Sequence, residues 1–369
     1  MTIVWRLSML PLFKVHKPKG IGDILEGVFD SGFLTEGDYS DQFERSLGEW
    51  IGNPNVCLTN SCTSALDLAR HMCDVGQGDE VITTAMTCMA TNLPFYQVGA
   101  KLVFADIQLD TGNIDPGEIE SKITERTKAI VFVHWAGRPA DLREIHAIAN
   151  RHGIPVVEDA AHALGAVYDG EKIGAHSDFV CFSFQAIKHL STADGGAIAC
   201  KRTEDSERIR RLRWFGLDRS RKDTQRWSQD IPEGGYKYHM NNLNAAIGIE
   251  QLKSIDSLID SHRRHASRYD AEINNSKIEK LKPFESGESA CWIYSLLVED
   301  REAFQAYLAE HQVASDWVHV RNDQYSIFSE FRTVLPNVDS FERRLINIPV
   351  GWWLSDQDVD HVIRIVNDY

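Results

Sequence analysis

The sequence lacks the patterns that mark several large classes of protein. Its seven cysteines form no Cys-x-x-Cys pair and no cysteine–histidine spacing of a metal site, so we expect reduced thiols in a cytoplasmic protein. Lysine and arginine total only 39 against 54 acidic residues, and the net charge of −15 disfavours binding to nucleic acid or to an anionic membrane. The sequence has no P-loop, no glycine-rich nucleotide loop and no ordered Ser-His-Asp set.

Long apolar runs, internal repeats and low-complexity linkers are also missing. The first twenty residues are apolar, but Arg6, Pro11 and Lys14 interrupt them, so we expect neither a signal peptide nor a membrane span there. What the chain does have is length. Its 369 residues suffice for one large or two ordinary domains with an ample core.

Short apolar strands alternate with helical stretches from Val56 to about Cys200. Such alternation is typical of an α/β fold with a mostly parallel sheet between helices. From about Ala245 the pattern changes to α+β, which predicts a large domain over 1–245, with an irregular arm over 1–20, and a small domain over 246–369. The sequence predicts seven sheet strands at 56–59, 80–83, 101–105, 129–134, 155–158, 179–184 and 197–201, and C-terminal helices over 245–259, 261–276, 301–311 and 356–366.

One lysine, Lys188, stands between two of these apolar strands. It follows the run Phe179–Phe184 and precedes the glycine pair at 195–196, among small hydroxylic residues. A lysine in a dry pocket loses its proton easily and can attack a carbonyl, which is the chemistry of a Schiff base with pyridoxal 5′-phosphate (PLP). A single lysine of this kind is more often an ordinary loop residue, because lysine is rarely buried.

Two other segments follow strand ends in the same half of the chain. Asp159 ends a strand where ligands bind in α/β sheets, and a carboxylate there suits the protonated pyridine nitrogen of PLP. The alternative for Asp159 is a helix N-cap. Ser61, Thr63 and Ser64 begin a helix, where free N–H groups and hydroxyls bind phosphate, although simple capping also explains them.

In this order the segments resemble the sugar aminotransferases of the DegT/DnrJ/EryC1/StrS family, PLP enzymes of fold type I. The resemblance runs from about Gly32 to Val366. It implies transfer of an amino group from an amino acid, for which we expect glutamate, to a nucleotide-linked keto-deoxysugar in polysaccharide or secondary-metabolite sugar biosynthesis. The blocks that carry it include SGFLTEG (31–37), GDEVITTAMTCMATN (78–92), EDAAHALGA (158–166), FSFQAIKHLSTADGG (182–196) and GYKYHMNNLNAAIGIEQL (235–252).

The resemblance also implies roles for individual residues. Lys188 would bind PLP and move protons, Asp159 would keep the pyridine nitrogen protonated and His162 would border the ring. The block 235–242 would reach into a second subunit, which implies a homodimer with shared active sites. The residues implied to bind the cofactor are Thr63, Ser64, Cys88, Asp159, His162, Ser183, Lys188 and Lys237.

Substrate-facing residues are implied less directly, at Leu34, Thr35, Trp135 and His239. Cys88 replaces an aromatic residue that is usual in the family, and Ala136 replaces a common tyrosine beside Trp135, which is itself more often a core residue. Lys237 and His239 stand where asparagine and arginine are common in the family. The alternative interpretation of Lys237 is an ordinary solvent-exposed side chain without a role in the site. Because these changes alter the wall of the pocket, the identity of the sugar and the ring position that is aminated are not inferred from the family.

Other functions stay open at this point. Relatives that are sugar dehydratases carry histidine in place of Lys188, and a non-catalytic relative would not need Asp159 and Lys188. The charged stretch Glu204–Trp227 favours a solvated helix with a mobile loop over a nucleic-acid site. Val320–Phe328 departs from the family pattern, and we expect it either to select the substrate or to be a structural loop.

Overall fold

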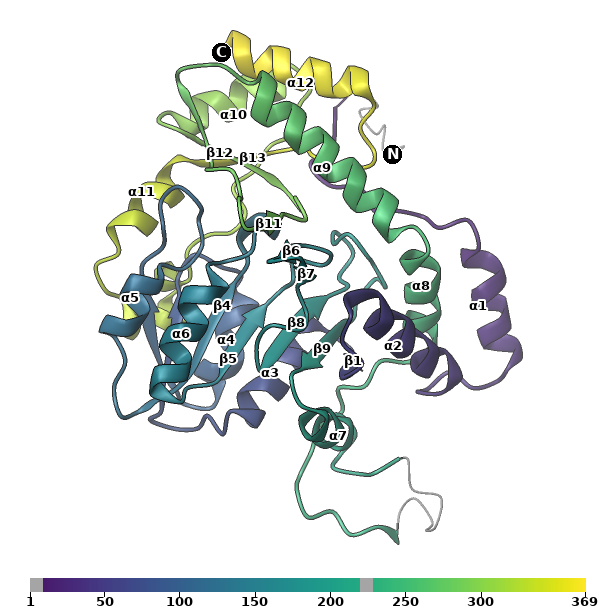
Figure 1. The fold of residues 1–369 in the computed structure, drawn as a ribbon. Helices are drawn as coiled ribbons and strands as arrows, with labels where there is room; N and C mark the ends of the chain where they lie inside the picture. The colour runs from purple at the N-terminus through teal and green to yellow at the C-terminus, as the bar shows by residue number, and fades with distance from the viewer. Residues whose placement is uncertain (1–8, 220–227) are drawn as a thin grey trace.

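A computed structural model describes residues 9–219 and 228–369 (Figure 1). Residues 1–8 of the predicted arm and 220–227 of the charged stretch lie outside the described residues. The centre of the fold is a seven-stranded sheet in the order β1-β9-β8-β5-β4-β2-β3. Its strands are β1 (Val56–Thr59), β2 (Glu80–Thr84), β3 (Lys101–Ala105), β4 (Thr127–Val133), β5 (Val156–Asp159), β8 (Phe179–Ser183) and β9 (Gly196–Cys200).

The seven predicted strands are therefore confirmed, with ends that differ by one or two residues. Parallel ladders join β8, β5, β4, β2 and β3, while β9 runs antiparallel to its neighbours β8 and β1. The carboxyl ends of β1, β2, β5 and β8 consequently lie along one edge of the sheet. Ligands of open α/β sheets bind at such an edge.

Helices cover both faces of this sheet because its strands are apolar on both sides. Val180 and Phe182 of β8 pack into one core with α2, α6 and α8, whereas Phe179 and Cys181 pack into another with α3, α4 and α7. The first helices are α1 (Ile21–Asp30), α2 (Asp38–Ile51), α3 (Cys62–Met72), α4 (Met89–Gln97), α5 (Pro116–Ser121), α6 (Leu142–His152) and α7 (Thr203–Leu212), with the 3-10 turn η1 (Trp135–Gly137).

A second unit with its own core follows (Figure 1). Its three-stranded sheet has the order β10-β12-β13, and a small sheet, β11-β6-β7, lies between the two units. The remaining elements of the described chain are β6 (Val167–Tyr168), β7 (Glu171–Lys172), β10 (Ile278–Lys280), β11 (Gly287–Glu288), β12 (Tyr294–Val298), β13 (Leu345–Ile348), α8 (Asn242–Leu252), α9 (Ile255–Glu272), α10 (Arg301–Glu310), η3 (Asn322–Gln324), η4 (Ser326–Phe331), α11 (Pro336–Arg344) and α12 (Asp356–Asp368).

The helix predicted over 245–259 is wrong as a single element. The chain turns at Ser254, whose N–H bonds to the Gln251 carbonyl, and α9 then runs from Ile255 past the predicted break at residue 260. Ile249 before the turn and Ile255 after it are buried in the same core. The apolar pattern therefore continues through the turn, which is why it resembles one helix.

The N-terminal segment from residue 9 packs on the second unit. Leu10 forms a bridge with Val313, and Trp353 Nε1 donates to the Pro11 carbonyl at 3.0 Å. This contact brings Phe13 onto Trp292, with ring centroids 5.1 Å apart.

Within the described ranges, none of the helices is both long enough and apolar enough to cross a bilayer.

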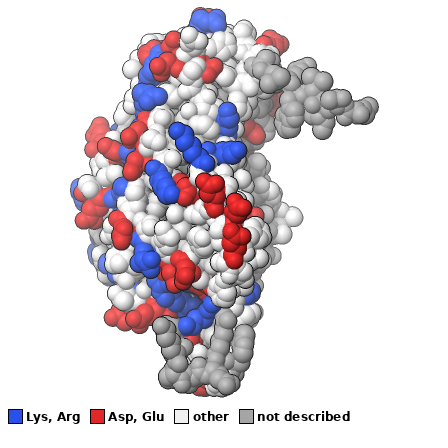
Figure 2. Space-filling model, turned by 90° about the vertical axis from the view of Figure 1, so that its right-hand side faces the viewer, with Lys and Arg blue, Asp and Glu red and all other residues white. Residues whose placement is uncertain are grey.

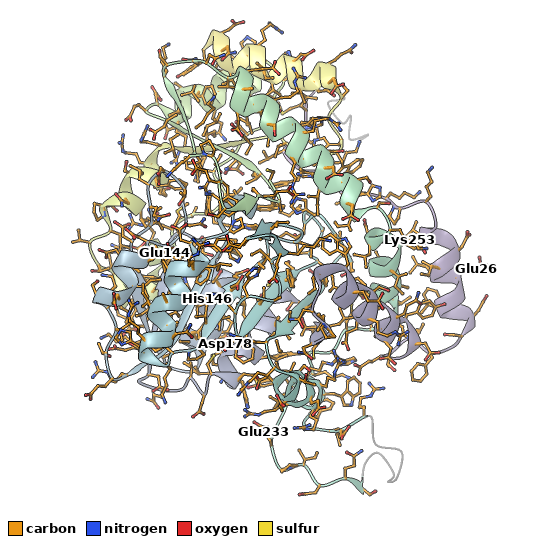
Figure 3. All side chains as sticks on the ribbon, viewed as in Figure 1. Glu26, Glu144, His146, Asp178, Glu233 and Lys253 are labelled. Carbon is orange, nitrogen blue, oxygen red and sulfur yellow. The ribbon has the colours of Figure 1, made fainter. Side chains whose placement is uncertain are left out.

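Three of the four arginines in α7 and directly after it form ion pairs within the chain. Arg208 pairs with Glu233, which Figure 3 labels below α7, and Arg210 pairs with Glu44. Arg213 pairs with Glu44 as well. Acidic and basic side chains are also mixed over the face in Figure 2. The basic run is thus largely neutralised by intramolecular partners.

Candidate active site

Lys188 and Asp159 lie at the carboxyl edge of the sheet, where they were predicted. Asp159 is the last residue of β5, and Lys188 lies in the loop between β8 and β9. The neighbouring ladder pairs Asp159 with Cys181 of β8, so the lysine loop begins beside the aspartate. The two charges are near enough that the Asp159 carboxylate raises the pKa of Lys188.

The amine of Lys188 is in an apolar, half-buried position. Its Nζ lies 3.8 Å from the centre of the Trp292 ring, and Trp292 Nε1 donates to the carbonyl of Ile187 at 2.9 Å. Burial disfavours the ammonium form and lowers the pKa of Lys188 to about 8, although Asp159 opposes this shift. Since about a quarter of such an amine is neutral at pH 7.5, Lys188 can act as a nucleophile near neutrality.

Asp159 is 2% exposed, and both of its carboxylate oxygens accept a hydrogen bond. Thr91 Oγ1 donates to Oδ2 at 2.7 Å, and the Ala161 N–H donates to Oδ1 at 3.0 Å. Burial raises the pKa of Asp159, and the two donors oppose that rise. The Cys62 thiol also donates weakly to Oδ1 at 3.9 Å, whereas Oδ2 keeps a further lone pair, so this carboxylate can bind one more cationic N–H group.

His162 is buried beside the lysine and is held as a neutral imidazole. Its ring stacks on Trp292 with centroids 3.9 Å apart, and its Nε2 lies 3.4 Å from Nε2 of His319. Burial, with Lys188 as the next contribution, lowers the pKa of His162 well below the usual value. Its Nδ1 is buried without a hydrogen-bond partner among the described residues. This nitrogen is therefore available to a polar atom of a ligand.

The start of α3 has the hydroxyl groups predicted there. Ser61 is the N-cap, and its Oγ accepts from the Ser64 N–H at 3.0 Å, so the capping alternative is observed for Ser61. Ser64 Oγ donates to Asn60 Oδ1 at 2.6 Å, and Thr63 is half-buried in the same turn. Gly196 of β9 approaches this turn so closely that a Cβ would lie 2.5 Å from the Cys62 nitrogen.

Ser183 is the last residue of β8 and its Oγ accepts from the Gln185 N–H at 3.3 Å. Cys88 is half-buried at the N-cap of α4, and burial raises its pKa, with Asp159 and Lys188 as smaller electrostatic contributions. Ser183 thus begins the lysine loop, and Cys88 lies within electrostatic range of both charged groups.

The four residues predicted to face substrate have different surroundings. Leu34 and Thr35 are exposed, and their carbonyls accept from the N–H of Asn242. Trp135 is 1% exposed, and its Nε1 donates to Ser295 Oγ at 3.3 Å. His239 is buried against the ring of Trp214, with centroids 3.7 Å apart. Trp135 is therefore a core residue in this structure, which was the alternative to a substrate-facing position in the sequence analysis.

Lys237 is exposed, but its segment lies against the start of α3 of the same chain. Its carbonyl accepts from Asn60 Nδ2 at 3.2 Å, and its Nζ lies 3.3 Å from the centre of the Trp214 ring. The backbone of this segment therefore borders the hydroxyl cluster, whereas the lysine side chain extends to Trp214.

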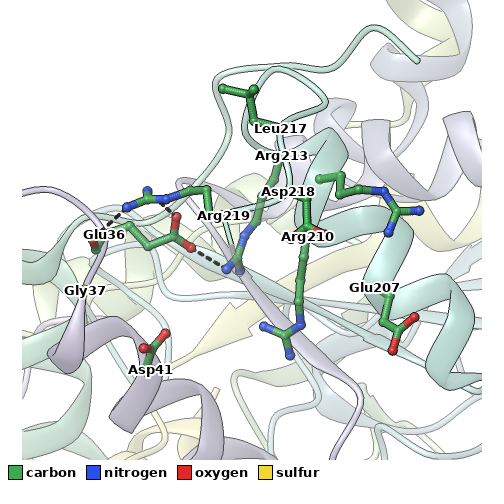
Figure 4. Close-up of a pocket in the computed structure, with 10 residues that line it drawn as sticks. Glu36, Gly37, Asp41, Glu207, Arg210, Arg213, Leu217, Asp218 and Arg219 are labelled. Carbon is green, nitrogen blue, oxygen red and sulfur yellow. Dashed lines mark hydrogen bonds and ion pairs between the residues drawn. The ribbon is translucent and has the colours of Figure 1, made fainter. Parts of the chain in front are cut away.

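A pocket of about 620 Å³ lies apart from Lys188, between α7 and the loop before α2 (Figure 4). Glu36 binds both Arg213 and Arg219 in it. Four arginines and four carboxylates line this pocket, so it has no excess of positive charge. The lining residues are Glu36, Gly37, Asp41, Glu207, Arg210, Arg211, Arg213, Leu217, Asp218 and Arg219.

Three contacts at the site had not been predicted from the sequence. Thr91 lies in a block that the sequence analysis quoted, but nothing in the block singled it out as the donor to Asp159. Trp292 and His319 come from the C-terminal part of the chain and meet Lys188 and His162 only through tertiary packing. No local pattern identifies either residue.

The arrangement fits PLP. Among the described residues, the site combines a lysine with a lowered pKa, a buried carboxylate with a spare lone pair, a buried imidazole nitrogen without a partner and hydroxyls at a helix start. These are the groups that a carbonyl, a pyridine nitrogen, a phenolic oxygen and a phosphate require.

Comparison with known proteins gives the same result. The model of the DegT/DnrJ/EryC1/StrS aminotransferase family matches residues 19–367. The spore coat polysaccharide biosynthesis protein SpsC of Bacillus subtilis is 33% identical over 97% of this chain and 95% of its own length.

Solved structures agree over nearly the whole chain. The sugar aminotransferase CalS13 from Micromonospora echinospora has a TM-score of 0.94 and 35% identity, covering 98% of this chain and 100% of its own. Spr1654 from Streptococcus pneumoniae, in its PLP-form, has a TM-score of 0.90 and 28% identity, covering 98% of each chain. The same protein in its PMP-form matches with a TM-score of 0.90 and 29% identity, covering 98% of this chain and 97% of its own.

Proposed function

Because this chain belongs to the DegT/DnrJ/EryC1/StrS family and is a PLP-dependent sugar aminotransferase of fold type I, we propose that it aminates a nucleotide-linked keto-deoxysugar. We propose glutamate as the amino donor. The observation that carries the assignment of the site is the pairing of Lys188, with its lowered pKa, and the buried Asp159 at one edge of the sheet.

The roles of the residues follow from their surroundings. The neutral amine of Lys188 is the nucleophile that binds the cofactor carbonyl. Asp159, aimed by Thr91 and the Ala161 N–H, holds a proton on the pyridine nitrogen by its negative charge. Thr63, Ser64 and Ser183 bind the phosphate, and Cys88 and His162 border the ring. When bound, PLP supplies an electron sink for the carbanion formed at the donor's α-carbon.

With PLP and the amino donor bound, Lys188 would have a second task as a carrier of protons. Its Nζ takes the proton from the donor's α-carbon and later returns a proton to the product, as a base and then as an acid. A pKa of about 8 suits both directions near neutral pH. Trp292 excludes water from one side of Nζ, since its ring lies 3.8 Å away.

Dehydration of the sugar is less well supported than transamination. It would call for a histidine where Lys188 stands, and the neighbouring His189 is otherwise engaged. His189 Nε2 lies 2.9 Å from the Ala290 carbonyl, and its ring packs on His262 with centroids 4.6 Å apart. A non-catalytic role is also disfavoured, because both Lys188 and Asp159 are in place.

We propose that the enzyme is a homodimer whose active sites are shared. Exposed aromatic and aliphatic side chains at the end of α1 and in the loop after it support this proposal, since Phe29 is 59%, Phe33 52% and Leu34 39% exposed. Lys237 and His239 would approach the second subunit's phosphate and substrate. Leu34 and Thr35 would border the sugar.

We propose a domain division at residues 1–245 and 246–369, which the separate C-terminal core supports. We also propose a cytoplasmic location, supported by seven free cysteines.

The test of the function is a half-reaction followed by absorbance. Purified protein is loaded with PLP and mixed with glutamate, without sugar. Conversion of the band of lysine-bound PLP into that of PMP supports both the reaction and the donor. A PLP band that glutamate leaves unchanged, while another amino acid converts it, would overturn glutamate alone. No conversion with any amino acid would overturn the proposed reaction.

A further inference from the structure

Asn322, in the segment that departs from the family pattern, contacts the turn between β2 and α4, just before Thr91, the hydrogen-bond donor of Asp159 in the first turns of α4. Its backbone N–H donates to the Ala85 carbonyl at 2.7 Å, and its Nδ2 donates to the Thr87 carbonyl at 2.6 Å. Its Oδ1 accepts from Asn92 Nδ2 at 2.8 Å. Asn322 itself is 0% exposed. One asparagine from the C-terminal half thus makes two hydrogen bonds to the segment between β2 and α4 and a third to Asn92 in α4.

Thr87 of that segment connects to Asp159 through Thr91 of α4. Thr87 Oγ1 lies 2.7 Å from Thr91 Oγ1, and Thr91 Oγ1 donates to Asp159 Oδ2 at 2.7 Å. A hydroxyl has one hydrogen, so Thr91, which donates to the carboxylate, accepts from Thr87. The direction of every bond in the chain from Thr87 to Asp159 is therefore fixed. Both threonines are 0% exposed, so water does not replace a missing donor there.

Asn322 is well placed to fix this turn because its own backbone is anchored on both sides. Arg321 forms two hydrogen bonds with the carboxylate of Asp323, at 2.6 and 2.7 Å, and also pairs with Asp339. Phe328 is buried and its ring lies 5.3 Å from that of Tyr96 in α4. These contacts hold the segment against α4. They favour the interpretation of Val320–Phe328 as a structural loop over its interpretation as a loop that selects the substrate.

We propose that Asn322 is a positioning residue for the cofactor site: it sets the turn at Thr87, and the Thr87–Thr91 hydroxyl pair then aims and stabilises the Asp159 carboxylate. The inference rests on the proposed role of Asp159 toward the pyridine nitrogen. It gives the departing segment a function that acts through other residues and does not touch substrate.

The test uses full-length protein loaded with PLP labelled with ¹⁵N at the pyridine nitrogen. The ¹⁵N chemical shift reports whether that nitrogen is protonated, and a titration of the apoenzyme gives the dissociation constant of PLP. The variants are Asn322→Ala, Thr91→Val, the double variant and Asp159→Asn as the reference for a lost carboxylate. Asn53→Ala is the matched control, because buried Asn53 makes three side-chain hydrogen bonds, to Gly174, Cys200 and Asn55, against two for Asn322, and lies at the opposite edge of the sheet from Asp159.

Asn322→Ala should raise the dissociation constant of PLP about five- to tenfold, the effect of roughly one lost hydrogen bond, and move the ¹⁵N shift toward the unprotonated value. In the Thr91→Val background the same change should have less than about a twofold effect, because the two residues act in one chain. Asn53→Ala should lower the melting temperature without changing either PLP readout. If Asn322→Ala does not fold, Asn322→Ser, which keeps a hydroxyl donor, replaces it.

The outcomes distinguish a failure of the positioning role of Asn322 from a failure of the proposed role of Asp159. An Asn322→Ala protein that is less stable but has unchanged PLP affinity and ¹⁵N shift overturns the positioning role. Effects of Asn322→Ala and Thr91→Val that add in full overturn the route through Thr91. An Asp159→Asn protein with an unchanged ¹⁵N shift overturns the assignment of Asp159 and this inference with it.

Discussion

The Nζ of Lys188 lies 3.8 Å from the centre of the Trp292 ring, and the same ring stacks on His162 at 3.9 Å. One indole from the C-terminal half of the chain thus contacts both the proposed nucleophile and the imidazole beside it. Because Trp292 Nε1 also donates to the Ile187 carbonyl, it holds the backbone next to the lysine. The position of Lys188 depends on packing between the two halves of the chain.

The first prediction concerns the lysine itself. Lys188→Ala should keep the fold but lower transamination by at least about a thousandfold, because the chain loses both its nucleophile and its proton carrier. Lys172→Ala is the matched control, since Lys172 also lies over an indole, with Nζ 3.7 Å from the centre of the Trp50 ring. Steady-state rates and circular dichroism measure both variants. Full activity of Lys188→Ala would refute the assignment of the nucleophile.

The second prediction is the pH dependence of cofactor capture. Only the neutral amine attacks a carbonyl, so the rate of PLP binding by the apoenzyme should rise with pH around a midpoint near 8 rather than at the usual lysine value of 10.5. Stopped-flow absorbance measures this rate. Asp159→Asn should move the midpoint lower, because the negative charge of Asp159 raises the pKa of Lys188. A midpoint close to 10.5 would mean that the lysine is exposed to solvent.

The sequence was sufficient for the sheet, because apolar strands buried on both faces are visible without tertiary information. Asp159 and Lys188 stood out by their places beside strand ends, but their proposed roles came from the resemblance to a family, since each residue alone had a more common structural interpretation. The turn at Ser254 was missed because apolar residues continue across it, and Ile249 and Ile255 are buried in the same core. Propensity alone does not locate a turn inside such a pattern.

The contacts that tune the site could not be derived from the sequence. Trp292, His319 and Asn322 reach the sheet edge from the C-terminal half, and each acts by a tertiary contact that no local pattern encodes. The resemblance to a family did not supply Asn322 either, because Val320–Phe328 is where the sequence departs from that family. The roles of Leu34, Thr35, Lys237 and His239 stay predictions.

The third prediction concerns the buried ion pairs beside the α7 pocket. Arg213 is 5% exposed and pairs with Glu36 and Glu44, which are 8% and 9% exposed. Arg213→Met should destabilise the protein by about 3–5 kcal/mol, because it leaves two buried carboxylates without this partner. Arg143→Met, which breaks the exposed pair with Asp169, should cost less than about 1 kcal/mol. Urea unfolding compares the two, and equal losses would contradict the importance of burial here.

The fourth prediction tests the shared active site by mixing two inactive variants. Lys188→Ala lacks the nucleophile, and Lys237→Ala lacks the side chain that we expect to reach the second subunit's phosphate. If each site takes Lys188 from one subunit and Lys237 from the other, a mixed dimer contains one site with both lysines. Such a dimer should regain activity, up to about a quarter of the wild-type rate when the subunits exchange at random, a limit set by the twofold symmetry of the dimer.

Two further results decide this prediction. Sedimentation should show a dimer for the wild type and for each variant, so that lost activity is not lost assembly. Lys253→Ala, which changes an exposed lysine paired with Glu250 on the surface, serves as a partner for Lys188→Ala that carries an intact Lys237. Because its Lys253→Ala homodimers keep both sites, this mixture should keep about half of the wild-type rate, and the mixed dimers should contribute about half of that activity. If Lys188→Ala and Lys237→Ala exchange subunits and yet stay inactive, both lysines belong to the same site, and Lys237 acts within its own chain.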